Sequence, residues 1–337
     1  MLSSSALPLF APAPARLVGI ARLAAQGHSL EHLRQVEYFT LPARSLLNRC
    51  NSAMVPFPWT INPYRGCEFA CQYCYARYTH EFMELRDPAA FEHQIFVKQN
   101  AGWLLRRELR RVKPGEEIAI GTATDPYQPA ERQFEVTRSI LEELARHHGL
   151  TLSLITKSNL VVRDLELLRA IAGHNRLAVS VTVTTLDARL ARILEPRAPR
   201  PDLRLEAVRQ LSRAGITTSV SCCPVLPGIT DKPRDLEAVV RAAAEAGARH
   251  LFANPLFLKP CSASVFLPFL DREFPTLVEA YRRRYADRAF LPASYRKRIS
   301  SLVSGLKKKY GLAGRLHSEP AHDYPGDAAA LEQLALF

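Results

Sequence analysis

Residues 62–77 read NPYRGCEFACQYCYAR and contain three of the 7 cysteines in this chain of 337 residues. Cys67, Cys71 and Cys74 follow a C-x3-C-x2-C spacing, and the aromatic Tyr73 stands directly before the third cysteine. A loop this short can direct three thiolates at one inorganic centre. Because four thiolates complete a cubane iron–sulfur cluster, three would leave one iron open to a substrate or cofactor.

Other uses of these cysteines compete with a cluster. A zinc site could use the three cysteines with His80, but zinc modules usually bring a second, distant ligand pair, and the sequence contains no second C-x2-C. Free buried thiols are disfavoured because the loop carries Gly, Arg and Gln rather than apolar residues. A disulfide framework is disfavoured because so few cysteines in so long a chain do not make a small stapled domain.

With its flanks, the motif resembles the cluster loop of the radical S-adenosylmethionine (SAM) enzymes, in the branch similar to spore photoproduct lyase. The resemblance implies that Cys67, Cys71 and Cys74 ligate three irons of a 4Fe–4S cluster and that the fourth iron holds the amino and carboxylate groups of SAM. Reduction would cleave SAM to methionine and a 5′-deoxyadenosyl radical, which takes a hydrogen atom from a substrate. Tyr73 falls at the cofactor site.

The rest of the chain predicts an α/β fold. Short β-branched runs alternate with amphipathic segments, as in repeated strand–helix units. The predicted strands are 60–64, 94–98, 117–121, 151–156, 177–183, 216–222 and 250–254. The predicted helices are 104–112, 132–147, 163–172, 203–214 and 235–246. Parallel strands joined in this way give an open sheet or a barrel. The resemblance selects a partial (β/α)6 TIM-type barrel.

We expect four parts along the chain. They are an N-terminal extension over residues 1–59 with a loosely ordered beginning, a radical SAM core over 60–260, a basic helical region over 261–315, and a flexible tail over 316–337.

Three polar side chains near predicted strand ends match SAM contacts of the resembled family. Thr124 lies in the loop after strand 117–121, Lys157 ends strand 151–156, and Ser180 lies in strand 177–183. From the residues alone, a capped turn explains Thr124 equally well. Without the resemblance, a lysine that reaches solvent is the preferred interpretation of Lys157, and Ser180 is an ordinary strand serine.

The final hydrogen-atom donor is a point of departure from the lyases. Where those enzymes place a cysteine near a strand end, this sequence has Thr122 or Ala123. Cys222 and Cys223 are adjacent on a predicted strand, so their side chains face opposite ways, and one of them could supply the hydrogen atom. Arg197 follows Glu195 in a proline-rich turn and could engage that carboxylate or a ligand.

The charge distribution suggests the substrate. The formal net charge is +12, and basic residues concentrate between Arg272 and Lys309 among tyrosines, a mixture that suits phosphate contact with base stacking. The charge alone identifies no particular partner. Together with the resemblance to the lyase branch and the tail described below, this basic segment favours DNA or another nucleic acid as the substrate, in repair or modification. The alternatives are a radical SAM enzyme acting on a peptide or small molecule, and a non-catalytic protein that binds metal and nucleic acid.

Further partners follow from the resemblance and the tail. The resemblance implies an electron donor such as flavodoxin or ferredoxin. Gln333–Phe337 reads QLALF and resembles the peptide by which bacterial repair proteins bind the sliding clamp. Clustered, unpaired cysteines suit a reducing cytoplasm. No membrane partner is expected, because no apolar run approaches the about 20 residues that span a bilayer.

Overall fold

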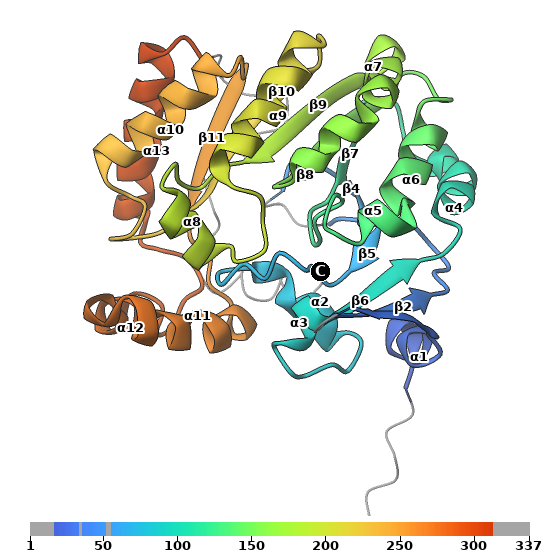
Figure 1. Ribbon diagram of the computed structural model, residues 1–337, viewed down its shortest axis with the longest axis horizontal. Helices are drawn as coiled ribbons and strands as arrows, with labels where there is room; N and C mark the ends of the chain where they lie inside the picture. The colour runs from blue at the N-terminus through green and yellow to red at the C-terminus, as the bar shows by residue number, and fades with distance from the viewer. Residues whose placement is uncertain (1–16, 34–35, 52–54, 313–337) are drawn as a thin grey trace, which may run out of the picture.

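A seven-stranded sheet forms the centre of the fold (Figure 1). The computed structural model describes residues 17–33, 36–51 and 55–312. The sheet order is β11-β10-β9-β8-β7-β4-β3. The six strands from β11 to β4 in this order are parallel, and β3 is antiparallel to β4. The strands are β3 (Leu47–Arg49), β4 (Trp59–Ile61), β7 (Glu117–Ile120), β8 (Thr151–Thr156), β9 (Arg176–Thr182), β10 (Thr217–Val225) and β11 (His250–Pro255). This open sheet confirms the predicted partial barrel.

Helices follow the parallel strands and cover the outer face of the sheet (Figure 1). They are α4 (Ala101–Glu108), α5 (Glu131–Phe134), α6 (Val136–Leu144), α7 (Leu165–His174), α9 (Pro201–Arg213) and α10 (Pro233–Glu245). The helix α8 (Ala188–Leu194) instead packs with the cysteine segment through Leu190 and Leu194. The predicted helix over residues 132–147 is divided into α5 and α6, because Glu135 adopts a left-handed φ of 47°. The short α8 was missed.

A second, four-stranded sheet lies beside the barrel in the order β1-β2-β6-β5. It contains β1 (Ser29–Leu33), β2 (Val36–Leu41), β5 (Tyr64–Arg65) and β6 (Gln94–Lys98). Strand β6 was predicted correctly as a strand but wrongly as a unit of the barrel, because a short apolar run looks the same in any buried strand. Its partners β2 and β5 join the N-terminal part of the chain to the segment that precedes the cysteines.

The two faces of the barrel sheet differ in chemistry. Along β8 burial alternates: Leu152 and Leu154 pack in the main core with the outer helices, whereas Ser153 and Ile155 remain partly exposed on the inner face. Ser180 of β9 is in register with Ile155, and its other register partner is Ser219 of β10. Since register neighbours project from the same face, small polar side chains line the inside of the barrel.

The remaining helices are α1 (Gly19–Ala25), α2 (Tyr78–Glu81), α3 (Ala90–His93), α11 (Pro260–Glu273), α12 (Val278–Arg284) and α13 (Ala293–Lys309). Helices α11 and α12 supply Phe266, Phe269 and Tyr281 to a hydrophobic cluster that also contains Phe69 and Tyr73 of the cysteine segment. Helix α13 packs on β11 and α10. The C-terminal helices therefore cover the cysteine segment and close one edge of the barrel. No helix of the described residues has the length and apolar character of a membrane span.

Candidate active site

The cysteine loop follows β5 and is fixed by its backbone. Gly66 has a φ of 83°, and a Cβ atom there would lie 2.7 Å from the carbonyl oxygen of Gln94, so only glycine fits. The Gly66 carbonyl accepts hydrogen bonds from the Thr124 hydroxyl (2.6 Å) and from the Gln128 amide (3.2 Å). These bonds tie the beginning of the loop to the carboxyl end of β7.

Cys67, Cys71 and Cys74 are free thiols gathered in this loop. Burial raises the pKa of Cys71 to about 12, and it raises the pKa of Cys67 and Cys74 as well. The thiols are therefore protonated at neutral pH unless cations replace their protons. Three crowded thiols of this kind fit a cationic inorganic group, which would convert them to thiolates.

The zinc alternative with His80 is not supported. His80 lies on α2, packs against Phe91 and Phe96, and its Nε2 atom is 3.1 Å from the Gln94 carbonyl oxygen. Among the residues that the structure describes, no three His, Cys, Asp or Glu side chains are arranged to hold a single metal ion. A cluster makes a different demand, because each of its irons takes one thiolate.

Tyr73 is held by a buried ion pair. Its hydroxyl donates to Glu195, which also accepts from the Thr184 hydroxyl (3.2 Å) and pairs with Arg204 at 2.5 Å. The Glu195 and Arg204 side chains are 0% and 1% exposed. Burial is the largest single influence on the pKa of Glu195 and would raise it, but the charges of Arg204 and Lys157 and the hydrogen bonds from Tyr73 and Arg204 together hold it below its usual value. The carboxylate therefore stays charged and fixes the Tyr73 hydroxyl within the cluster that also contains Cys71.

The partner of Glu195 differs from the one considered from sequence. Arg197 does not reach the carboxylate, and its guanidinium instead lies 3.5 Å from the Glu92 carbonyl oxygen. Arg204 comes from α9 and also donates to the carbonyl oxygens of Pro199 (2.7 Å) and Thr182 (3.1 Å). The sequence offered many arginines near Glu195, and only the packing of α9 selects among them.

Lys157 lies beside Tyr73 at the carboxyl end of β8. Its ammonium group is 5.7 Å from the centroid of the Tyr73 ring and makes no hydrogen bond or ion pair with another described residue. The neighbouring Asp125 carboxylate is occupied by the Thr156 hydroxyl (2.7 Å) and by the backbone N–H of Lys157 (2.6 Å). Lys157 is thus a cation available to a ligand carboxylate at the edge of the cysteine loop.

Ser180 and Ser219 face the same space from β9 and β10. Both hydroxyls are buried and have no hydrogen-bond partner among the described residues. An unpartnered buried hydroxyl is costly unless a ligand satisfies it, so the pair fits a polar ligand within the barrel. Ser219 was not predicted. Its signal in the sequence is the serine at alternate positions of β10, Ser219 and Ser221, which mirrors Ser180 and Thr182 of β9.

Thr124 is already engaged within the protein. Its hydroxyl donates to Gly66 and accepts from the Gln128 amide at 3.0 Å. It therefore positions the cysteine loop in this structure, and its contact with SAM stays a prediction.

Cys222 and Cys223 have different surroundings. Cys222 is 1% exposed in the main core, with its thiol 3.9 Å from the Thr184 carbonyl oxygen. Cys223 is partly exposed, and its sulfur accepts from the backbone N–H of Asn254 at 3.2 Å. Cys223 is therefore the better placed of the two candidates for hydrogen-atom donation, which stays a prediction for both.

The basic C-terminal region is more structural than its sequence suggested. The tyrosine hydroxyls of Tyr281 and Tyr285 donate to the carbonyl oxygens of Pro227 and Leu256 (both 2.8 Å), and those of Tyr295 and Tyr310 donate to Asp231 and Glu237 (both 2.8 Å). These hydroxyl bonds anchor the helices, and base stacking by the rings stays a prediction. Gln333–Phe337 lies outside the described residues, and its clamp binding stays a prediction.

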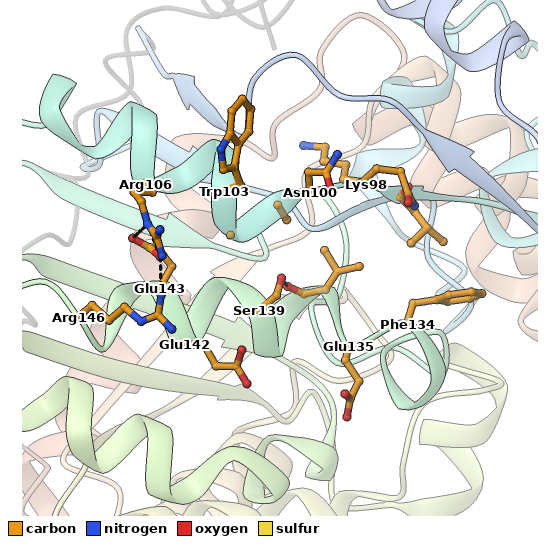
Figure 2. A pocket seen from close by; sticks show the side chains of 15 residues that line it. Lys98, Asn100, Trp103, Arg106, Phe134, Glu135, Ser139, Glu142, Glu143 and Arg146 are labelled. Carbon is orange, nitrogen blue, oxygen red and sulfur yellow. Dashed lines mark hydrogen bonds and ion pairs between the residues drawn. The ribbon is translucent and has the colours of Figure 1, made fainter.

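A groove between α4 and α6 lies apart from these residues (Figure 2). Arg106 and Arg146 both point to Glu143, with Arg106 at 2.7 Å. The groove contains none of the predicted site residues, so the candidate site is the cysteine loop and the inner barrel face.

Comparisons with known proteins identify the family and the fold. The chain is 37% identical over 281 residues to the uncharacterized protein Rv2578c of Mycobacterium tuberculosis, covering 83% of this chain and 82% of that protein. It is 26% identical over 251 residues to the uncharacterized protein MJ0683 of Methanocaldococcus jannaschii, covering 74% and 86%. In fold it is similar to spore photoproduct lyase complexed with dinucleoside spore photoproduct, with a TM-score of 0.62 and 15% identity over 81% of this chain and 79% of that one. A variant of that lyase with bound AdoMet gives a TM-score of 0.63. The sequence model of the Radical SAM superfamily matches residues 61–243, and the chain therefore belongs to this superfamily of enzymes.

Proposed function

We propose that this enzyme carries a 4Fe–4S cluster on Cys67, Cys71 and Cys74 and uses it to cleave SAM reductively, for hydrogen abstraction from DNA or another nucleic acid. The observation that carries the proposal is the gathering of three free thiols beside an available ammonium group and two unpartnered serine hydroxyls. When bound, the cluster and SAM supply the 5′-deoxyadenosyl radical.

The chain's own residues would bind and orient SAM. Lys157 would pair with its carboxylate, and Ser180 and Ser219 would satisfy its polar groups from the inner barrel face. Tyr73, fixed by Glu195, would pack beside the cluster. The helices α11 and α12 would exclude water from the cysteine loop through the apolar cluster around Phe266.

Cys223 is proposed as the donor that returns a hydrogen atom to the product. It takes the place of the lyase cysteine that this sequence lacks near Thr122, and its sulfur lies in the partly exposed segment at the carboxyl end of β10. A reduced flavodoxin or ferredoxin is proposed as the electron donor.

The basic surface supports the nucleic-acid substrate, together with the fold shared with a lyase complexed with a dinucleoside. A peptide or small molecule is the alternative substrate class. Family membership weighs against the non-catalytic alternative, because the superfamily consists of enzymes.

The test is anaerobic reconstitution with iron, sulfide, SAM and dithionite, followed by mass spectrometry for 5′-deoxyadenosine. We expect a brown protein that forms 5′-deoxyadenosine faster when UV-irradiated DNA is added, with deuterium passing from labelled DNA. Cys71→Ala should remove the colour and the product, whereas Cys50→Ala, which changes a buried cysteine outside the loop, should keep both. A colourless, zinc-loaded wild-type protein would refute the cluster, and indifference to DNA would refute the substrate class.

A further inference from the structure

A chain of aromatic rings lies beside the third cysteine. Tyr78 and Phe82 of α2 are in edge contact, with centroids 5.7 Å apart, and Phe257 and Phe290 are stacked with centroids 4.6 Å apart. The Lys259 ammonium joins the two pairs, at 4.0 Å from the Tyr78 centroid and 6.0 Å from that of Phe257. We call these five residues the aromatic strip.

The aromatic strip flanks the cysteine loop on two sides. Its first pair follows Cys74 through the short helix η1 (Tyr75–Arg77), which leads directly into α2. Its second part precedes α11, where the Ser262 hydroxyl donates to the Cys74 carbonyl oxygen at 3.0 Å. Backbone pairing between Leu258 and Ala289 (2.9 Å) holds Phe257 beside Phe290. Three segments far apart in sequence thus converge next to the proposed cluster.

The rings of the aromatic strip are accessible. Phe82 is 40% exposed, and Tyr78, Phe257, Lys259 and Phe290 are each partly exposed. Large aromatic side chains left open beside a reaction site commonly mark a recognition surface rather than a core. They differ in this from the tyrosines of α12 and α13, whose hydroxyls are bonded to the protein.

The charge beside the aromatic strip is complementary to phosphate. Arg65, which precedes the loop on β5, makes no side-chain hydrogen bond or ion pair within the described part of the chain, and its charge acts on the Tyr78 hydroxyl. Lys259 adds a second cation, while Glu81 is the acidic group that acts on it. Open ring faces with interleaved cations are the arrangement that binds single-stranded nucleic acid, because every base has a face to stack and every nucleotide carries a phosphate.

We propose that the aromatic strip stacks unpaired bases of a nucleic-acid strand and leads that strand to the cysteine loop. This inference rests on the proposed nucleic-acid substrate and specifies its form: a single strand or a locally opened duplex, recognised through base faces. A duplex that stayed fully paired would hide those faces from the rings.

The test measures binding to the holoenzyme without reductant. The probes are a fluorescent single-stranded DNA of about 12 nucleotides, within the site size of typical single-strand binders, an abasic strand of equal length, and the paired duplex. We expect the intact strand to bind about tenfold more tightly than the abasic strand, because stacking supplies that difference. Phe82→Ala and Phe257→Leu should each weaken the intact strand about tenfold and leave the abasic strand unchanged.

Two variants separate stacking from charge and from general exposure. Lys259→Met should reduce the salt dependence of binding for both the intact and the abasic strand: the slope of log affinity against log salt concentration should become shallower by about 0.7. Trp103→Ala is the matched control, because Trp103 is 55% exposed with Arg107 at 4.6 Å from its ring, on α4. It should change nothing. Unchanged iron content and melting temperature will show that the variants fold, and Phe82→Ala removes a ring that is already open to solvent.

Several outcomes would overturn the inference. Equal affinity for intact and abasic strands, a preference for the duplex, or equal losses in Trp103→Ala would each do so, as would a polyglutamate peptide of matching charge that competes as well as DNA. Failure of the proposed function looks different: oligonucleotides would bind through the strip but never alter 5′-deoxyadenosine formation. Conversely, DNA-dependent turnover with unaltered binding by Phe82→Ala and Phe257→Leu would retain the function and reject the strip.

Discussion

Replacing Arg204 with methionine should lower the stability of the fold more than the same substitution at an exposed arginine. The substitution keeps the apolar volume but leaves the Glu195 carboxylate, 0% exposed, without its counter-charge. It also removes the donors to the Thr182 and Pro199 carbonyl oxygens. Breaking one side of a buried ion pair costs about 3–5 kcal/mol, so we expect the free energy of unfolding to fall by about 4 kcal/mol.

Urea unfolding followed by circular dichroism measures this loss. With a denaturant slope of about 3 kcal/mol per molar, the midpoint should fall by roughly 1.3 M. The double variant Arg204→Met/Glu195→Gln should recover about 2 kcal/mol relative to Arg204→Met, because the uncompensated charge is gone. The double variant should also lose bound iron, since in it Tyr73 loses the charged carboxylate that holds its hydroxyl.

The control lies on the same helix. Arg209 pairs with Glu206 at the surface, with side chains 37% and 44% exposed, so Arg209→Met should change stability by less than about 0.5 kcal/mol. The reasoning is refuted if Arg204→Met unfolds within about 1 kcal/mol of the wild type, or if the double variant is no more stable than the single.

Three further outcomes are expected. Ser180→Ala should weaken SAM binding about fivefold in calorimetry without lowering the melting temperature, because it removes a hydroxyl to which no described residue bonds. Unchanged SAM affinity would count against this prediction, and so would an equal loss of affinity in the control Ser212→Ala, whose hydroxyl lies at an exposed site. Burial lowers the pKa of Lys98 from 10.5 to about 7, so the unfolded chain takes up the proton more readily than the folded one. Lys98→Met should therefore raise the free energy of unfolding by up to about 4 kcal/mol at pH 7, and the gain should shrink near pH 10. A loss of stability at pH 7 would contradict the assignment. Burial, aided by the nearby charges of Arg65 and Arg77, lowers the pKa of His80 from 6.5 to about 4. The wild type should therefore lose up to about 3 kcal/mol of stability as the pH falls through that window, and His80→Gln should lose that much less. Parallel pH profiles of the two proteins would show that His80 is not responsible.

The sequence predicted the strands and helices of the barrel because their signals are local, whereas the family resemblance selected a barrel over an open sheet. Strands 117–121 and 151–156 are apolar runs bounded by turns, and the structure has β7 and β8 within a residue of them. The signal for strand 94–98 was also local. The sheet to which this strand belongs, however, is decided by its pairing with Val36–Leu41 and Tyr64–Arg65, which are distant in sequence and so could not be identified from a local pattern. The predicted helix over 132–147 is interrupted at Glu135, which adopts a left-handed φ. The interruption was not predicted, because this position is not a glycine.

The candidate site divides in the same way. The cysteines share one loop, so their spacing alone brought them together. The partner of Glu195 and the neighbour of Ser180 depend on packing between elements, and Arg204 and Ser219 therefore emerged only in three dimensions. Cys222 and Cys223 show what the sequence could not predict. The alternation of a strand predicted that their side chains face opposite ways, but only the packing around Cys222 shows that its side chain is the one in the core.

The bond from Ser262 to the Cys74 carbonyl has a consequence for the order of biosynthesis. It joins residues 188 positions apart, so the shelter of the cysteine loop is made by a segment that leaves the ribosome long after the cysteines themselves. Until α11 emerges, the apolar cluster around Phe69 and Tyr73 lacks Phe266 and Phe269. A nascent chain would therefore present its thiols unprotected. The machinery that delivers iron and sulfide would meet an open cysteine loop before α11 is synthesised and a covered loop after the chain has folded.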